Sequence, residues 1–270
     1  MRYSIRDFAA PPSEWPENEV RQAEEILASL GLIDSMTARD KILRIAAHLH
    51  NELDQHRGSP EPFMRRSSAW QQYVSAIGGR SRVYCSNFAE IFAFFASVAG
   101  VPTRLVDVRG HLADVPLAAH AFNEAYDSDS NQWMYVDLQL SVGAILTASG
   151  RALNGVDILL RRQASNQHDL IVKGLARGKI SNEPISEFSE MVNFFIPSEA
   201  TLVYLWASAN RFSVADRALR LMIYPQPAVS IRQSRPNSTL RLLPSYIGAV
   251  GFVFSVCILL YLRGKRRRPL

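Results

Sequence analysis

The stretch "YCSNFAEIFAFFASVAGVPTRLVDV", residues 84–108, combines the patterns of a buried helix, a helix stop and a strand. Its apolar and small residues recur at three and four positions, as on a packed α-helix, namely Phe88, Ala89, Phe92, Phe95, Ala96 and Ala99. Gly100 suits the end of such a helix, and Pro102 prevents its continuation. We therefore expect a helix over Cys85–Ala99 and a strand over residues 103–108.

Two further helices are expected on the N-terminal side of this stretch. The first is "ENEVRQAEEILASLGL", residues 17–32, which ends at Gly31. The second spans residues 37–58, with Thr37 and Asp40 as a capping box at its start. Its apolar stripe at helical spacing consists of Ile42, Ile45 or Ala46, Leu49 and Leu53.

Two strands are expected on the C-terminal side. "AHAFNEAY", residues 119–126, and "QWMYVDL", residues 132–138, flank the turn-rich segment "DSDSN". Residues 57–82 are expected to be mainly loop, with a short helix over Trp70–Ile77. Helices followed by an antiparallel sheet indicate the α+β class.

The composition indicates a folded protein with an uneven distribution of charge. With 47% hydrophobic residues and 10% aromatic residues, the 270-residue chain has enough apolar material for a packed core. Its formal net charge is +5, but basic residues concentrate in residues 232–268, and the remainder is slightly acidic. This distribution suggests a tail that flanks a membrane and gives no support for nucleic-acid binding.

The segment "LLPSYIGAVGFVFSVCILLYL", residues 242–262, has 21 residues without a charge. A helix of this length spans the bilayer hydrocarbon core of about 30 Å. We therefore expect a membrane span, followed by the basic "RGKRRR". Its Gly248 and Gly251 do not have the spacing of a GxxxG dimer motif.

The side of the membrane on which the folded part lies stays open. The basic tail favours a cytoplasmic C-terminus, which would place the folded part outside. The start of the sequence has no apolar segment typical of a signal peptide, which favours a tail-anchored protein in the cytoplasm.

The two cysteines differ in their surroundings. Cys257 lies in the expected span and Cys85 in the folded part, so we expect no disulfide between them. A cysteine among phenylalanines is usually a small core residue. Cys85, however, opens a helix, and the positive end of the helix dipole favours a thiolate there.

A histidine and an aspartate are expected to approach each other on the hairpin. If residues 127–130 form its turn, Tyr126 lies opposite Asn131, and counting back places His120 opposite Asp137. An imidazole next to the thiol can accept and return its proton, and the carboxylate can orient the ring. The alternatives are a structural histidine and an aspartate that caps a strand end.

These motifs resemble the transglutaminase-like superfamily of papain-like cysteine enzymes. The matching segments are "YCSNFAEIFAFFASVAGVPTRLVDVRG", "HAFNEAY" and "QWMYVDLQL", within residues 35–140. The resemblance implies a papain-like core with Cys85 as nucleophile, His120 as base and Asp137 as the orienting residue. The sequence departs from the family pattern at Val83, where glycine is frequent, and at Phe122, where tryptophan is frequent, but neither change removes a reactive group.

Other polar residues are candidates for roles in such a site. His111, expected in a loop, competes with His120 as base but has no aspartate partner on the hairpin. For a second oxyanion donor, the side-chain types leave Trp70, Gln71 and Gln72 as candidates. His48, His50 and His56 do not share a helix face, so we expect a solvated helix surface and no metal site.

The resulting organisation has six parts. They are an N-terminal arm and helix (1–34), a transglutaminase-like catalytic core (35–140), a mainly helical extension (141–231), a basic linker (232–241), the span (242–262) and a basic tail (263–270). Two functions stay open: a membrane-anchored enzyme that attacks an amide or peptide carbonyl and hydrolyses it or transfers its acyl group, and a catalytically silent binding or assembly module. We expect a protein or peptide-like substrate, a lipid bilayer around 242–262, no nucleic acid, no cofactor and no metal.

Overall fold

A computed structural model of the protein describes residues 15–32, 35–112, 115–188, 201–205 and 228–231. The chain divides into two units, Met1–Arg211 with Ala228–Gln233, and Phe212–Pro227 with Ser234–Leu270. All described residues belong to the first unit. Residues 1–14 of the expected N-terminal arm, the linker at 232–241, the span at 242–262 and the basic tail lie outside the described residues.

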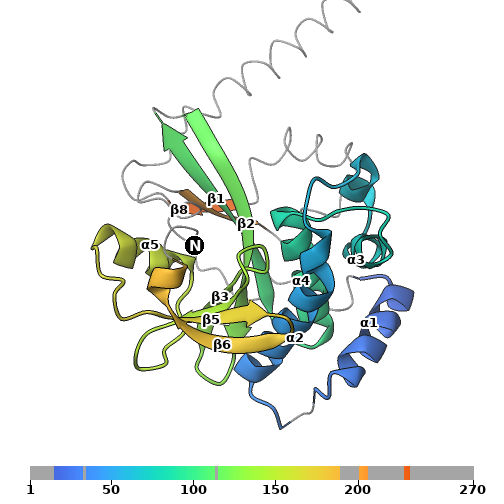
Figure 1. Ribbon diagram of the computed structural model, residues 1–270, viewed down its shortest axis with the longest axis horizontal. Helices are drawn as coiled ribbons and strands as arrows, with labels where there is room; N and C mark the ends of the chain where they lie inside the picture. Colours follow the sequence, from blue (N-terminus) through green and yellow to red (C-terminus); the bar gives the residue numbers. More distant parts are fainter. Residues whose placement is uncertain (1–14, 33–34, 113–114, 189–200, 206–227, 232–270) are drawn as a thin grey trace, which may run out of the picture. The chain divides into compact units, whose positions relative to one another are not determined.

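Within the described residues, four α-helices precede the first strand (Figure 1). They are α1 (Glu17–Ser29), α2 (Ala38–Leu53), α3 (Ala69–Ile77) and α4 (Cys85–Val98), with short 3-10 turns at η3 (Asp54–His56) and η4 (Pro62–Arg66). α2 begins where the backbone N–H of Asp40 donates to Thr37 Oγ1 at 3.1 Å, which is one half of the expected capping box. α4 ends before Gly100, whose φ of +76° needs glycine. The four helices predicted before residue 100 are therefore present, although α2 ends at Leu53, before the expected end at residue 58.

Two antiparallel sheets complete the described part. The five-stranded sheet has the order β3-β2-β1-β7-β8 and consists of β1 (Thr103–Leu112), β2 (Val115–Asp127), β3 (Gln132–Val136), β7 (Thr201–Leu205) and β8 (Ala228–Ile231). The three-stranded sheet consists of β4 (Val142–Leu146), β5 (Ile171–Ala176) and β6 (Lys179–Pro184). Helices and antiparallel strands confirm the α+β class.

The extension at 141–231 was expected to be mainly helical, and this expectation is wrong for its described residues. They contain the five strands β4 to β8 but one α-helix, α5 (Gly155–Gln163), and the 3-10 turn η5 (Ile185–Glu187). Between β5 and β6, Arg177 and Gly178 both have positive φ, +48° and +72°. Two such residues make the tight turn of a β-hairpin, so the apolar residues of this segment pair as strands.

The register of the β2–β3 hairpin differs by two residues from the expected one. Tyr126 pairs with Trp133 and Asp127 with Gln132, so the turn begins after Asp127. The Asp127 carboxylate accepts hydrogen bonds from the Asp129 N–H at 3.2 Å and from Ser130 Oγ at 2.7 Å, which keeps Asp127 at the end of the strand. Because side chains alternate with a period of two, this shift leaves every residue on its expected face.

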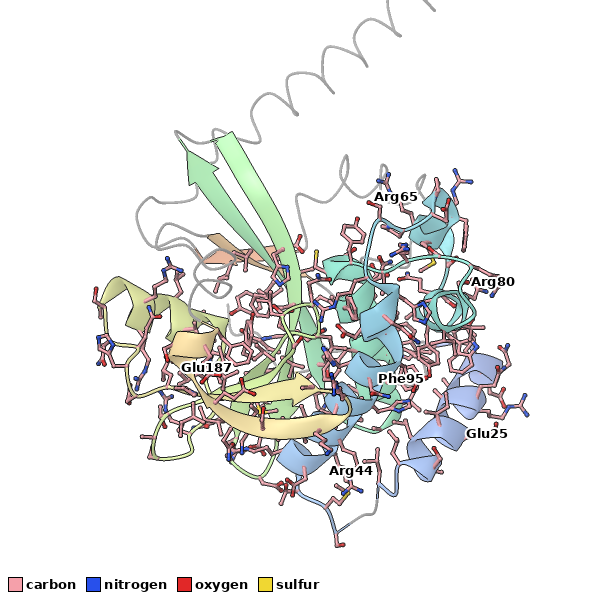
Figure 2. All side chains as sticks on the ribbon, in the orientation of Figure 1. Glu25, Arg44, Arg65, Arg80, Phe95 and Glu187 are labelled. Carbon is pink, nitrogen blue, oxygen red and sulfur yellow. The ribbon has the colours of Figure 1, made fainter. Side chains whose placement is uncertain are left out.

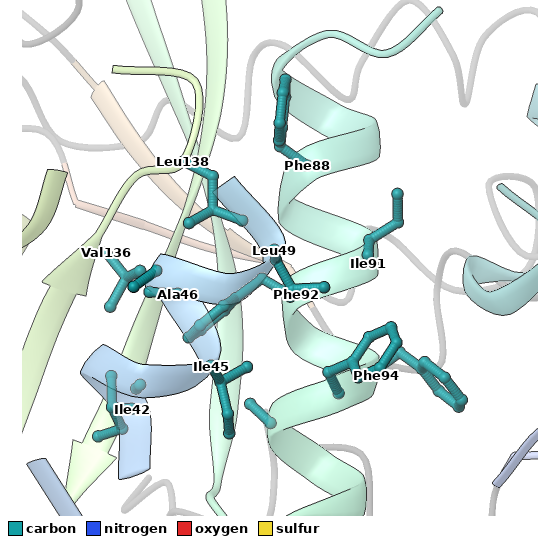
Figure 3. Close-up of a cluster of buried hydrophobic side chains, with 14 of the residues drawn as sticks. Ile42, Ile45, Ala46, Leu49, Phe88, Ile91, Phe92, Phe94, Val136 and Leu138 are labelled. Atoms are coloured by element: carbon teal, nitrogen blue, oxygen red, sulfur yellow. The ribbon is translucent and has the colours of Figure 1, made fainter. Parts of the chain in front are cut away.

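The main hydrophobic core surrounds α4. Figure 3 shows Phe88 and Phe92 of α4 on the side of α2, where Ile42, Ile45, Ala46 and Leu49 lie, with Val136 and Leu138 at the sheet and with Ile91 and Phe94 on the side of α4 away from α2. On the other side, the Phe95 ring lies 5.0 Å from that of Tyr73 on α3, between ring centroids. In Figure 2, Phe95 lies among these packed side chains, while the exposed Glu25, Arg44, Arg65, Arg80 and Glu187 point outward. Packing on several sides fixes α4 and therefore the position of its first residue, Cys85.

No helix within the described ranges is both long and apolar enough to cross a membrane.

Candidate active site

Cys85 is the first residue of α4, as expected from the sequence. Its side chain is partly buried against Ala89, Leu105 and Ala121. Ala121 directly follows His120 on β2, so the thiol packs against the strand that carries the histidine. The cysteine is a free thiol.

His120 and Asp137 are in contact. Nε2 of His120 lies 2.6 Å from Oδ2 of Asp137, and the two side chains are 2% and 1% exposed. Asp137 directly follows β3, and its backbone exchanges two hydrogen bonds of 2.8 Å with Val142. The predicted contact therefore forms, although the two residues are diagonal neighbours in the observed register.

The electrostatic environment favours a charged imidazole at position 120. Burial alone would lower the pKa of His120, but the charge and hydrogen bond of Asp137, together with the Cys85 side chain, raise this pKa to about 9. The contribution of Cys85 includes a hydrogen bond to the histidine. The structure thus brings Cys85, His120 and Asp137 together, with His120 as an imidazolium at neutral pH.

Two further groups hold the Asp137 carboxylate. The Tyr135 hydroxyl donates to Oδ2 at 2.7 Å, and the Leu140 N–H donates to Oδ1 at 3.2 Å. Three donors from three different residues therefore fix the orientation of this carboxylate. Sequence reasoning missed Tyr135, although it lies two positions before Asp137 and so on the same face of the strand.

Gln72, one of the oxyanion candidates, supports the start of α4. Its Nε2 donates to Glu90 Oε2 at 2.6 Å and to the Ser67 carbonyl at 3.2 Å, and its Oε1 accepts from Asn87 Nδ2 at 2.8 Å. Asn87 Oδ1 in turn accepts the backbone N–H of Tyr84, the residue before Cys85, at 3.3 Å. The Gln72 amide is thus engaged in positioning the first turn of α4.

The other two candidates are also engaged in structure. Gln71 is exposed and forms the capping box of α3 with Ser68. The Trp70 ring packs against Tyr73, Phe94 and Phe95. These two side chains therefore serve the capping of α3 and the packing of the core.

His50 is buried, and the expectation that it lies on a solvated helix surface is wrong. Its Nε2 lies 2.8 Å from Ser141 Oγ and 3.2 Å from Arg57 Nη2. Burial lowers the pKa of His50, opposed by the charge of Asp54 and reinforced by that of Arg57. The interaction with Ser141, 91 residues away in the sequence, explains why helix periodicity alone could not reveal this burial.

Arg57 connects this cluster to the segment that follows Asp137. Its guanidinium donates to the carbonyls of Leu138 and Gln139 and, at 3.0 Å, to Ser141 Oγ. Within this segment lies Leu140, whose N–H binds Asp137. Arg57 therefore stabilises the segment after Asp137 that provides the Leu140 N–H to its carboxylate.

His111 and the metal-binding residue types complete the survey of the site's surroundings. His111 lies within β1, opposite Pro116, and not in a loop. Among the residues that the structure describes, no group of three or more histidine, cysteine, aspartate or glutamate side chains is arranged to hold a metal ion.

A buried ion pair explains several of the remaining sequence motifs. Arg104 on β1 donates to Glu124 on β2 through Nε at 2.8 Å and through Nη2, and Glu124 is fully buried. The Arg104 guanidinium lies 4.0 Å above the Trp133 ring of β3. The second Glu124 oxygen accepts from the Gly155 N–H at 2.7 Å and from the Tyr204 hydroxyl at 3.2 Å. Arg104, Glu124 and Trp133 thus form contacts that connect β1, β2 and β3, and Glu124 also connects them to β7 and to the start of α5.

A family model agrees with this fold. Residues 31–138 match the family model of the transglutaminase-like superfamily. Among solved structures, the chain is similar to "a Putative Cysteine Protease from Cytophaga hutchinsonii", with 17% sequence identity and a TM-score of 0.31. The match covers 66% of this chain and spans 57% of that protein chain. A comparison with curated proteins gave no match. Residues 31–138, which include Cys85, His120 and Asp137, therefore match the transglutaminase-like superfamily, and this part of the chain has a transglutaminase-like fold.

Proposed function

We propose that the protein is a membrane-anchored, transglutaminase-like cysteine enzyme that acts on an amide or peptide carbonyl through a thioester acyl-enzyme. The observation that carries this proposal is the contact of the buried His120 with both Asp137 and Cys85. A structural cysteine needs no imidazolium beside it, whereas a nucleophilic thiolate is stabilised by one. In this proposal Cys85 is the nucleophile, His120 the acid and base, and Asp137 the residue that orients the ring.

The first half of the reaction forms the thioester. The Cys85 thiolate attacks the carbonyl carbon, and a C–S bond forms as the carbonyl oxygen becomes an oxyanion. Because Nε2 of His120 contacts Asp137, Nδ1 is the ring nitrogen that exchanges a proton with the reacting groups. When the oxyanion collapses, the C–N bond breaks and the imidazolium gives its proton to the leaving amine.

The second half of the reaction restores the enzyme. The neutral imidazole takes a proton from the acceptor, whose oxygen or nitrogen attacks the thioester. The C–S bond then breaks, and the thiolate and imidazolium return. We favour water as the acceptor, because it is always available, whereas transfer to an amine needs a site that excludes water.

The first turn of α4 supplies groups that suit the oxyanion. Backbone N–H groups at a helix start have no partner within the helix, and the helix dipole places partial positive charge there. The backbone N–H of Cys85 is our candidate for one oxyanion donor. Gln72 and Asn87 would act indirectly, by holding the turn that presents this N–H.

The membrane anchor is the part of the proposal that rests on the sequence. Residues 242–262 form an uncharged segment of 21 residues with a basic cluster behind it. A reporter fused after Leu270 tests it, since labelling of that reporter from one side of the membrane reveals both insertion and orientation. A chain that extracts from membranes with carbonate would contradict the anchor.

Alkylation of Cys85 tests the proposed chemistry. The full-length chain in detergent is treated with iodoacetamide across pH 5 to 9, and modified Cys85 is quantified by peptide mass spectrometry. We expect alkylation well below pH 8.5, near which an ordinary cysteine ionises, and we expect His120→Ala to abolish this low-pH reactivity. Cys85→Ala, which keeps Cys257, gives the background. Reaction of Cys85 at alkaline pH alone would contradict the enzyme proposal and favour a silent binding module.

A further inference from the structure

The hydroxyl of Tyr135 contacts the Asp137 carboxylate but has no role in the reaction steps proposed above. It donates at 2.7 Å to Oδ2 of Asp137, the same oxygen that His120 Nε2 approaches at 2.6 Å. Tyr135 is fully buried, and its ring packs on that of Phe122, with 4.6 Å between the centroids. Packing explains the aromatic ring but not a hydroxyl placed on the catalytic carboxylate, because phenylalanine would fill the same space.

The hydroxyl is a permanent donor. Burial raises the pKa of Tyr135 well above its ordinary value, and the negative charges of Asp137 and Glu124 raise it further. The phenol therefore keeps its proton at neutral pH and can donate its hydrogen bond to Asp137. Glu124, which is opposite Tyr135 on β2, is itself paired with Arg104, so it does not accept this proton.

We propose that Tyr135 is a positioning residue of this site: its hydroxyl fixes Asp137 and shares with His120 the carboxylate oxygen that stabilises the imidazolium. This inference rests on the proposed function of Cys85, His120 and Asp137. A carboxylate oxygen that accepts two hydrogen bonds divides its negative charge between two donors. Tyr135 thereby limits how strongly Asp137 stabilises the protonated His120, so that the imidazolium can release its proton to a leaving group.

Removal of the hydroxyl has a defined consequence. In Tyr135→Phe the ring and its packing stay, but Oδ2 of Asp137 has His120 as its remaining donor among the contacts found in the described residues. The charged groups that act on His120 are Asp137 and Cys85, and neither changes in this variant. His120 should then keep its proton to a higher pH, by about one pKa unit, because a hydrogen bond to a charged group is lost.

Alkylation with iodoacetate measures this shift. Iodoacetate is anionic, so its reaction with Cys85 slows when the neighbouring His120 loses its positive charge. The upper limb of the rate-against-pH profile of the full-length chain therefore reports the titration of His120. We expect Tyr135→Phe to move this limb to higher pH by about one unit. The matched control is Tyr126→Phe, which removes a hydroxyl bonded to Asn131 Oδ1 at 3.1 Å, away from the triad, and should leave the profile unchanged.

The outcomes separate this inference from the proposed function. A wild-type profile without an upper limb that depends on His120 would contradict both. A wild-type limb that depends on His120 but is identical in Tyr135→Phe would overturn the role of Tyr135 alone. If Tyr135→Phe does not fold, incorporation of 3-fluorotyrosine keeps ring and hydroxyl but strengthens the donor. The limb should then move to lower pH, and an unmoved limb would overturn the inference.

Discussion

The Nε2 atom of His120 lies 2.6 Å from Oδ2 of Asp137, in surroundings where both side chains are almost completely buried. An ion pair without water around it is strong only if both partners are present and well oriented. The three donors on Asp137 provide that orientation. The pair should therefore affect the stability of the fold as well as the reactivity of Cys85.

The stability of the protein should depend on pH through His120. Its pKa is raised to about 9 in the folded state from an ordinary value of 6.5, so its stabilising contribution is complete below pH 6.5 and is lost as the pH rises through 9. We expect the free energy of unfolding of wild type, relative to His120→Gln, to decrease by on the order of 3 kcal/mol between pH 6 and pH 10. Urea denaturation at both pH values measures the difference, and a difference independent of pH would argue against an imidazolium in the folded protein.

The buried ion pair between Arg104 and Glu124 should be necessary for the fold. Glu124→Ala removes the buried carboxylate that accepts from the Arg104 guanidinium, the Gly155 N–H and the Tyr204 hydroxyl. We expect a loss of about 3–5 kcal/mol in the free energy of unfolding. Asp169→Ala is the matched control, since it breaks an exposed pair with Arg161 at 2.9 Å and should cost less than about 1 kcal/mol. Equal losses in the two variants would mean that the buried pair has no special importance.

Arg57 should support the Asp137 site without touching it. Arg57→Ala removes the donors to the carbonyls of Leu138 and Gln139, and the loss of these part-buried hydrogen bonds should cost about 1–3 kcal/mol of stability. Because the Leu140 N–H then holds Asp137 less firmly, we also expect slower alkylation of Cys85 at pH 7. Arg80→Ala, an exposed arginine bonded to Ser75, serves as control and should change stability by no more than about 0.5 kcal/mol. An unchanged alkylation rate in Arg57→Ala would limit its role to stability.

Local patterns were enough to predict the elements that carry the proposed site. The apolar period of α4 and the stop at Gly100 depend on residues close in the sequence, so Cys85 could be placed at a helix start. The hairpin register was wrong by two residues, because Asp127 binds Ser130 and Asp129 within its turn. The contact of His120 with Asp137 was still predicted correctly, because a shift by two residues keeps both side chains on the same face of the sheet.

Contacts between distant residues account for what could not be predicted. β4, β5 and β6 form a separate sheet, and the short apolar runs of β4 and β5 cannot be distinguished from buried helix segments by periodicity. The burial of His50 depends on Ser141, and the role of Gln72 depends on Asn87 and Glu90 across the packed helices. Tyr135 was overlooked because its role depends on which donor reaches a carboxylate, which a strand pattern does not reveal.

The central claim is that Cys85 forms a covalent acyl-enzyme, and a burst experiment tests it most directly. The full-length chain is mixed with excess p-nitrophenyl acetate, the released p-nitrophenolate is followed, and the quenched protein is digested for mass spectrometry. We predict a rapid burst of about one equivalent per chain, with a single acetyl group on the peptide that contains Cys85. His120→Ala should acetylate far more slowly, and Cys85→Ala, which keeps Cys257, should give no burst. A wild-type protein with no acetyl group on Cys85, or a burst of equal size in Cys85→Ala, would contradict the account.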